Sequence, residues 1–235
     1  MEMIEAISKM KLAAVLAILL TGCCAQPHPP APPASPTTSP ASADPPSMVH
    51  EAQLPQGFPP PGPIGQVIVK NYPACRAATV AASDVNGAGQ DDMFRPLFDH
   101  IQRENIAMTA PLQMDFEWVN VPAGSTQPSA KPPTAMSFVY RSPRTGKPGK
   151  DGIVTVRDLP AVTVISVGVR GSYNAEHFDY GLKAITDWLR IHPNSYRVVG
   201  PPRFLGYNSP FVPWFLRYGE VQIPVVPWSS RDPQP

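Results

Sequence analysis

The chain has 235 residues, 33 of them proline, and its 19 Lys and Arg nearly balance 18 Asp and Glu to give a formal net charge of +1. Long Pro-rich stretches do not build a packed core, so we expect one domain of about 160 residues rather than two. The balanced charge gives no sign of a nucleic-acid partner.

The first 22 residues have the pattern of a signal peptide. Lys9 and Lys11 precede an apolar run over residues 12–20, which is too short to span a bilayer and is typical of a signal-peptide core. Leu-Thr-Gly-Cys follows at residues 20–23. A small residue before a cysteine at this place resembles the bacterial lipobox, so we expect Cys23 to be lipidated. The alternative is an ordinary secretory signal cleaved near Ala25.

This N-terminal pattern predicts a lipid-anchored protein of the bacterial cell envelope, in the periplasm or on the outer face of a membrane. A secreted protein is the alternative. Residues 25–63 contain 14 prolines and only two charged side chains, so we expect residues 23–64 to form a disordered linker between anchor and domain. The domain is then expected over residues 65–228, followed by a disordered tail at 229–235.

The first half of the domain is predicted to contain a strand, a helix and two more strands. β-prone residues fill 67–69 and 74–81. Asp91 and Asp92 suit a helix start because negative charge is favourable at the N-terminal end of the helix dipole. An apolar stripe at helical spacing follows, formed by Phe94, Leu97, Phe98 and Ile101.

After this helix, residues 107–118 are predicted to form a strand with one buried side. Leu112, Met114, Phe116 and Trp118 alternate there with polar residues. Residues 135–141 are predicted to form the returning strand.

The second half repeats the same order of elements. Strand-like residues at 154–157 and 161–169 precede Asn174, a suitable N-cap for a helix that continues to Ile191. The closing strands are expected at 196–199, 204–207 and 220–226. Two copies of one β-α-β-β pattern indicate an internal duplication and an α+β fold.

Two motifs far apart in the chain carry a family resemblance. The first is the helix at 94–101 followed by Ile-Ala-Met-Thr-Ala-Pro at 106–111. The second is Tyr-Asn-Ser-Pro-Phe-Val-Pro at 207–213 with Arg217, Glu220 and Val221 after it. In this order, over roughly residues 66–226, they resemble the SOUL family of haem-binding proteins.

The resemblance implies a duplicated β-α-β-β unit whose strands form a distorted antiparallel β-barrel flanked by two helices. It also implies haem, or a related tetrapyrrole, as the bound partner and cofactor, with no defined catalytic centre. The function expected is therefore non-enzymatic binding in an apolar pocket of an envelope lipoprotein.

A haem site needs an apolar slot, cations for the propionates and, optionally, an axial donor. His100 is the candidate metal ligand, at the edge of the stripe and in a place where the family more often has tyrosine. The other interpretation is a helix-end histidine that interacts with the C-terminal dipole. If the family's use of its first helix carries over, the slot and its cations come from Met93, Phe94, Leu97, Phe98, Ile101, Arg95 and Arg103. The alternative is that the apolar members are plain core and the arginines are solvated.

Enzyme motifs are absent from the sequence. It has no Gly-rich phosphate loop opening a helix, no H-E-x-x-H and no G-x-S-x-G. Two other functions stay open. One is an envelope lipoprotein without haem that contacts another protein through exposed aromatic residues at 211–215. The other is a small-molecule enzyme on the same fold, with Glu117 or Glu220 beside Tyr140 or Tyr207.

Overall fold

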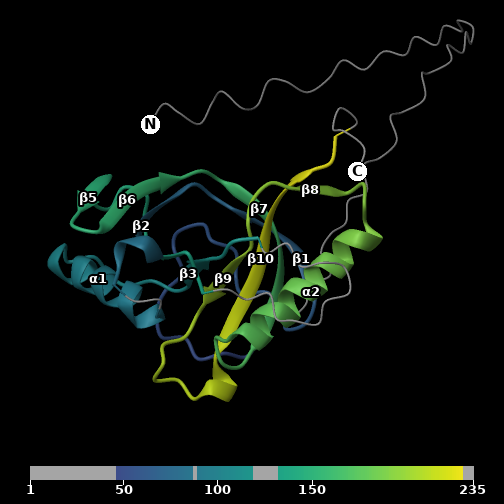
Figure 1. Ribbon diagram of the computed structural model, residues 1–235, viewed down its shortest axis with the longest axis horizontal. Coiled ribbons are helices and arrows are strands. Elements are labelled where there is room, and N and C mark those ends of the chain that lie inside the picture. The colour runs from purple at the N-terminus through teal and green to yellow at the C-terminus, as the bar shows by residue number, and fades with distance from the viewer. Residues whose placement is uncertain (1–45, 87–88, 119–131, 230–235) are drawn as a thin grey trace, which may run out of the picture. The chain divides into compact units, whose positions relative to one another are not determined.

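The computed structural model describes residues 46–86, 89–118 and 132–229 (Figure 1). The expected signal peptide, the lipidation site Cys23, the linker up to residue 45 and the tail from residue 230 lie outside the described residues. Within the described part, no helix is long and apolar enough to cross a membrane.

In chain order the elements are β1 Val67–Tyr72, β2 Cys75–Ala81, η1 Ala82–Asp84, α1 Gln90–Arg103, β3 Leu112–Asp115, β4 Ala135–Val139, β5 Gly149–Asp151, β6 Val154–Leu159, β7 Val162–Arg170, α2 Ala175–Ile191, β8 Tyr196–Val198, β9 Arg203–Gly206, η2 Trp214–Leu216 and β10 Tyr218–Pro227. Both helices were predicted to within a few residues. Asn174 caps α2 as expected, since its side chain accepts a hydrogen bond from the backbone N–H of His177.

The strands form one sheet in the order β1-β7-β10-β9-β3-β4-β2-β6-β5, with β8 paired to β10. This order repeats itself outward from its centre, with β3-β4-β2-β6 on one side and β9-β10-β7-β1 on the other. Each half is thus β-β-α-β-β along the chain, and its first strand pairs with the other half, β1 with β7 and β6 with β2. The α+β class is confirmed, and the pairing agrees with a duplication that includes one more strand per unit than predicted.

The sheet is not a closed barrel. Its two edge strands in the described part, β1 and β5, do not pair with each other. The expected barrel is therefore not confirmed, and the observed architecture is an open, mostly antiparallel sheet with two helices.

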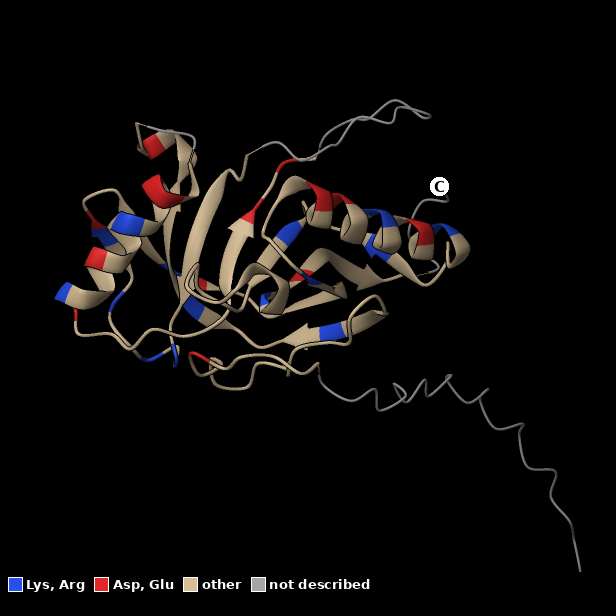
Figure 2. Cartoon of the chain, turned by 90° about the horizontal axis from the view of Figure 1, so that it is seen from below, with Lys and Arg blue, Asp and Glu red and all other residues tan. Residues whose placement is uncertain are grey.

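Both helices pack on the same face of the sheet, α1 on β2 and β4 and α2 on β7 and β10. Gly181 lets α2 lie close to β10, because a Cβ there would clash with Cγ2 of Val221. Figure 2 shows acidic and basic residues mixed along the helices, while most of the sheet is uncharged. The main apolar core therefore lies between the helices and this face.

The opposite face of the sheet is covered by residues 46–64, which we call the strap. Gln53 bridges to Thr109, Ile64 bridges to Gly168, and the ring of Phe58 meets Tyr72 edge-on with centroids 4.9 Å apart. The strap lies within the linker expected at 23–64, so chain that contacts the sheet begins well before residue 65. The strap contacts the sheet because its few apolar side chains, Met48, Ala52, Leu54 and Phe58, pack on a second apolar cluster.

The strap also changes the environment of β3. This strand spans only Leu112–Asp115, shorter than the predicted 107–118. Met114 and Phe116 are buried as expected, but Gln113 on the other side is buried too. The expectation of one buried side was wrong, because the sheet is covered on both faces.

Candidate functional site

Helix α1 separates the candidate haem-binding residues instead of gathering them in one slot. Phe94 and Phe98 lie half-buried on one edge of its buried face, with ring centroids 5.8 Å apart. His100 is on the opposite edge, because residues two positions apart on a helix point in different directions. Three other candidates are core residues beneath the helix: Met93, Leu97 and Ile101.

His100 is buried, and both of its ring nitrogens have protein partners. Nδ1 lies 2.6 Å from Oδ2 of Asp151, and Nε2 lies 2.7 Å from the hydroxyl of Tyr140. Hydrogen bonds from His100 and Arg103 lower the pKa of Asp151, so its carboxylate accepts and Nδ1 donates. An iron ion could take Nε2 only if the Tyr140 bond broke. The arrangement therefore does not present His100 as a free axial ligand.

Tyr140 completes this cluster as a neutral phenol. Burial, together with the nearby negative charge of Glu104, raises the pKa of Tyr140 to about 12. The hydroxyl therefore keeps its proton throughout the physiological range.

The two candidate arginines line an open groove beside α1 rather than the core. This groove has a volume of about 610 Å³, and its wall includes Arg95 and Arg103. Arg103 already pairs with Asp151, with Nη2 2.5 Å from Oδ2. The wall also carries four carboxylates, from Asp91, Asp92, Asp99 and Asp151. The groove is thus at least as acidic as it is basic, which is unfavourable for propionates.

A second, apolar hollow lies between the N-terminal ends of α1 and α2, and we call it the aromatic pocket. Its volume is about 260 Å³. The rings of Phe116 and Phe178 stack in its wall with centroids 4.1 Å apart. Met114 and Phe204, which are register partners on β3 and β9, also line it, so it lies where the two halves of the sheet join.

The mouth of the aromatic pocket is held by Tyr173 and Ala175. The Tyr173 hydroxyl donates to the backbone oxygen of Tyr218 at 2.8 Å and accepts from the backbone N–H of Asn208 at 2.8 Å. Ala175 is exposed at the first turn of α2. Sequence reasoning did not select this pocket, because its residues come from four separate elements. The alternation that buries Met114 and Phe116 was the available signal.

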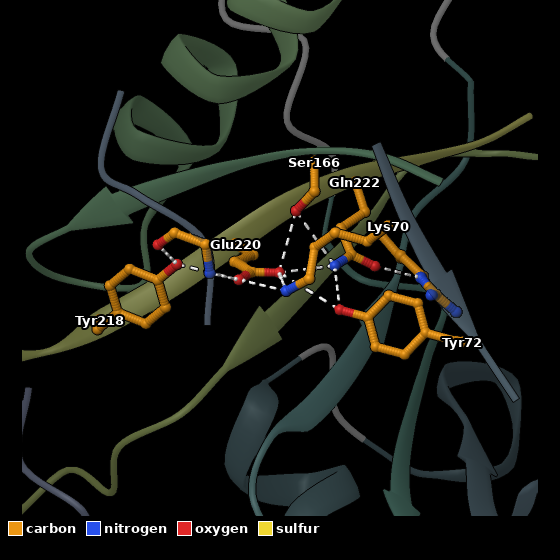
Figure 3. A network of polar contacts seen from close by, with 8 residues as sticks. Lys70, Tyr72, Ser166, Tyr218, Glu220 and Gln222 are labelled. Atoms are coloured by element: carbon orange, nitrogen blue, oxygen red, sulfur yellow. Dashed lines mark hydrogen bonds and ion pairs between the residues drawn. The ribbon is translucent and has the colours of Figure 1, made fainter. Parts of the chain in front are cut away.

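On the opposite face, the sheet buries an ion pair in a dense polar network (Figure 3). Nζ of Lys70 lies 2.8 and 2.9 Å from the two carboxylate oxygens of Glu220. The backbone N–H of Gly62 in the strap donates to Glu220 at 2.6 Å. Ser166 and Gln222 donate to the other carboxylate oxygen at 3.0 and 2.8 Å.

The network keeps Glu220 ionised and fully engaged. Burial raises the pKa of this carboxyl, but the charge of Lys70 and the hydrogen bonds from Lys70, Gly62 and Ser166 together outweigh burial and leave the pKa below its ordinary value. The tyrosines that touch Glu220 are Tyr72 and Tyr218. Tyr140, considered as its partner in the enzyme hypothesis, lies in the His100 cluster instead.

No group of three or more His, Cys, Asp or Glu side chains in the described ranges is placed to hold a metal ion. Among these residues the arrangement offers an apolar pocket on the helix side and a closed polar network on the strap side. The described part of the chain is thus an α+β domain with an apolar pocket.

A family model described as "SOUL heme-binding protein" matches residues 65–224. The chain belongs to this family, a family of binding proteins. A search of the curated proteins found no match.

Three solved structures are similar to the chain at low sequence identity. The EcmrR C-terminal domain is 14% identical with a TM-score of 0.50, covering 69% of this chain and 98% of that one. EcmrR in a DNA complex is 14% identical with a TM-score of 0.51, and the match covers 70% of this chain and 58% of that one. An uncharacterized conserved protein from Listeria innocua is 7% identical with a TM-score of 0.50, covering 70% and 94%. These likenesses concern the fold alone.

Proposed function

We propose that the domain binds haem or a related tetrapyrrole in the aromatic pocket, by apolar contact and without His100 as axial ligand. Membership of the SOUL family supports the ligand class. The observation that carries the choice of site is the aromatic wall of this pocket, where Phe116 stacks on Phe178 beside Phe204 and Met114. Flat macrocycles bind well against such surfaces.

The residues present fit one edge of a tetrapyrrole. A volume of about 260 Å³ lies just below the range of about 300–1,000 Å³ usual for ligand pockets. A tetrapyrrole would therefore be only partly enclosed, and the exposed amides of Gln90 and Asn174 could donate hydrogen bonds to its carboxylates. Bound haem would supply an iron centre for ligand binding or electron transfer.

Filling the pocket tests this proposal. Ala175→Trp adds a large ring at the mouth and removes no core contact, while Ala161→Trp makes the same change in an exposed turn between β6 and β7. Hemin titrated into the full chain should give a saturable Soret shift, absent from denatured protein. Ala175→Trp should weaken the affinity at least about tenfold, and Ala161→Trp should not. Equal affinities for the two variants would place the tetrapyrrole elsewhere.

We further propose that the protein acts in the cell envelope as a non-enzymatic binder, anchored by lipid at Cys23. The lipobox-like sequence at residues 20–23 supports the anchor. The engagement of Glu220 by Lys70 supports binding rather than catalysis, since that carboxylate is not free to move a proton. Labelled fatty acid should be incorporated into the wild-type chain and not into Cys23→Ala. Incorporation into neither would contradict the anchor and favour a secreted protein, and incorporation into both would contradict Cys23 as the lipidated residue.

A further inference from the structure

A loop between β9 and β10 carries a concentrated apolar surface. Residues 210–216, which we call the aromatic loop, have the sequence Pro-Phe-Val-Pro-Trp-Phe-Leu, without a polar side chain. The exposed fractions are 94% for Phe211, 61% for Trp214, 54% for Phe215 and 38% for Leu216. Large apolar side chains gathered in this way on a surface mark an interaction site.

Arg217 stabilises the conformation of the aromatic loop through hydrogen bonds to its backbone. Nε of Arg217 donates to the backbone oxygen of Val212 at 2.7 Å, and its Nη2 donates to that of Pro210 at 2.6 Å. Val212 is buried and anchors the middle of the loop. The exposed rings therefore project from a braced turn.

The strap begins beside this loop. Arg170 donates one hydrogen bond to the backbone oxygen of Ser47 at 2.5 Å and another to that of Leu216 at 3.5 Å. Asn208, just before the loop, donates to the backbone oxygen of Val49 at 2.7 Å. The described chain thus starts at the base of the aromatic loop, on the side to which the preceding segment attaches.

The proposed anchor at Cys23 precedes Ser47 by 24 residues in the sequence. At about 3.1 Å per residue, 24 residues span at most about 75 Å, so the length of this segment allows the loop to reach the bilayer that would carry the anchor. The loop also has the composition of a bilayer contact. Trp and Phe are suited to the membrane interface, and the Arg170 and Arg217 side chains at its base carry the charge that headgroups attract.

We propose that the aromatic loop inserts into the interface of the bilayer that carries the lipid anchor, and so holds the domain against the membrane in one orientation. This inference rests on the proposed anchoring and adds a second membrane contact to it. A membrane contact explains why the loop presents bulky apolar groups on a projecting turn instead of lining a groove.

Trp214 provides the test. The full chain is reconstituted into phosphatidylcholine vesicles that contain lipid brominated in the acyl chains, and tryptophan fluorescence is compared with vesicles of unbrominated lipid. Wild type should be quenched, and Trp214→Phe should remove at least about half of that quenching. Trp118→Phe is the matched control, because Trp118 is also exposed but lies after β3, and it should leave the quenching unchanged. Equal quenching in wild type and Trp214→Phe would overturn the proposal.

Two further measurements separate the remaining outcomes. Quenching at Trp214 that persists in Cys23→Ala would show that the loop contacts the bilayer without help from the anchor, while a wild-type chain that takes up no labelled fatty acid would contradict the anchor and leave the loop contact to the quenching result. Sedimentation tests a second copy of this chain as the occupant. A wild-type dimer that becomes monomeric in Phe211→Ser/Phe215→Ser, with no lipid quenching of Trp214, would make the loop a contact between copies and overturn the proposal.

Discussion

Nζ of Lys70 on β1 touches both carboxylate oxygens of Glu220 on β10, and these two buried residues lie 150 positions apart in the chain. The strand β7 lies between them in the sheet, and Ser166 on that strand also donates to Glu220. The pair is therefore a direct link between the first strand of the domain and its last.

Lys70→Met should be strongly destabilising, because it leaves a buried carboxylate without its cation. We expect a loss of about 3–5 kcal/mol in the free energy of unfolding, measured by urea denaturation. The matched control is Lys183→Met, which breaks an exposed pair with Asp187 on α2 and should cost less than about 1 kcal/mol. Similar losses of unfolding free energy in the two variants would contradict a larger contribution from the buried pair than from the exposed one.

The stability should fall in acid because of Glu220. Its pKa in the folded protein lies below the ordinary value of 4.5, so the unfolded chain binds the proton more readily. The contribution of this carboxylate is then complete above about pH 4.5 and is lost as the pH drops through the lower, folded pKa. Glu220→Gln should show a shallower loss of unfolding free energy below pH 4.5 than wild type. Parallel curves of unfolding free energy against pH in the two proteins would contradict a contribution of Glu220 to the loss of stability in acid.

Tyr140→Phe should cost about 1–2 kcal/mol of stability, because Nε2 of His100 loses its buried partner. It should leave the Soret spectrum of the hemin complex unchanged, since the proposed site does not use His100. The hemin complex of His100→Gln should likewise have the same Soret spectrum as that of wild type. A changed ligand-field band in either variant would restore His100 as an axial ligand.

Gly168→Ala should loosen the strap. A Cβ at this position would stand 2.6 Å from the backbone oxygen of Pro63, so the strap must shift to accept it. Amide hydrogen exchange should accelerate at Gly65, whose N–H donates to the oxygen of Gly168 at 2.8 Å. Gly200→Ala is the comparison, because its Cβ would approach only side-chain atoms of Pro224, at 3.3 Å. Unchanged exchange at Gly65 would mean that the strap is not held there.

Local patterns were enough to predict the helices, because apolar residues at 3.6-residue spacing and an Asn cap involve only residues that are close together in the sequence. The same patterns placed His100 at the edge of the buried stripe of α1. Its partner Asp151 lies 51 residues away, on a short strand after a loop, and no spacing rule connects them.

Longer-range pairing could not be predicted from these patterns. Lys70 and Tyr72 follow a β-prone run, and nothing near them indicates that Glu220 will lie beside them. The strap was predicted as linker because proline dominates its composition, yet its few apolar side chains pack on the sheet, among them Leu54 and Phe58. The aromatic pocket likewise depends on β3 meeting β9, a contact between the two halves of the duplication.

The exchange of first strands makes the two repeats dependent on each other for folding. A fragment that ends after β4 would lack β6, the neighbour of β2, and would hold β1 without its partner strand β7. Neither repeat is therefore expected to be a stable module alone, and assembly must wait for contacts between distant parts of the chain, which slows folding. The domain could therefore not be divided in two between β4 and β6 without exposing strand edges in both pieces.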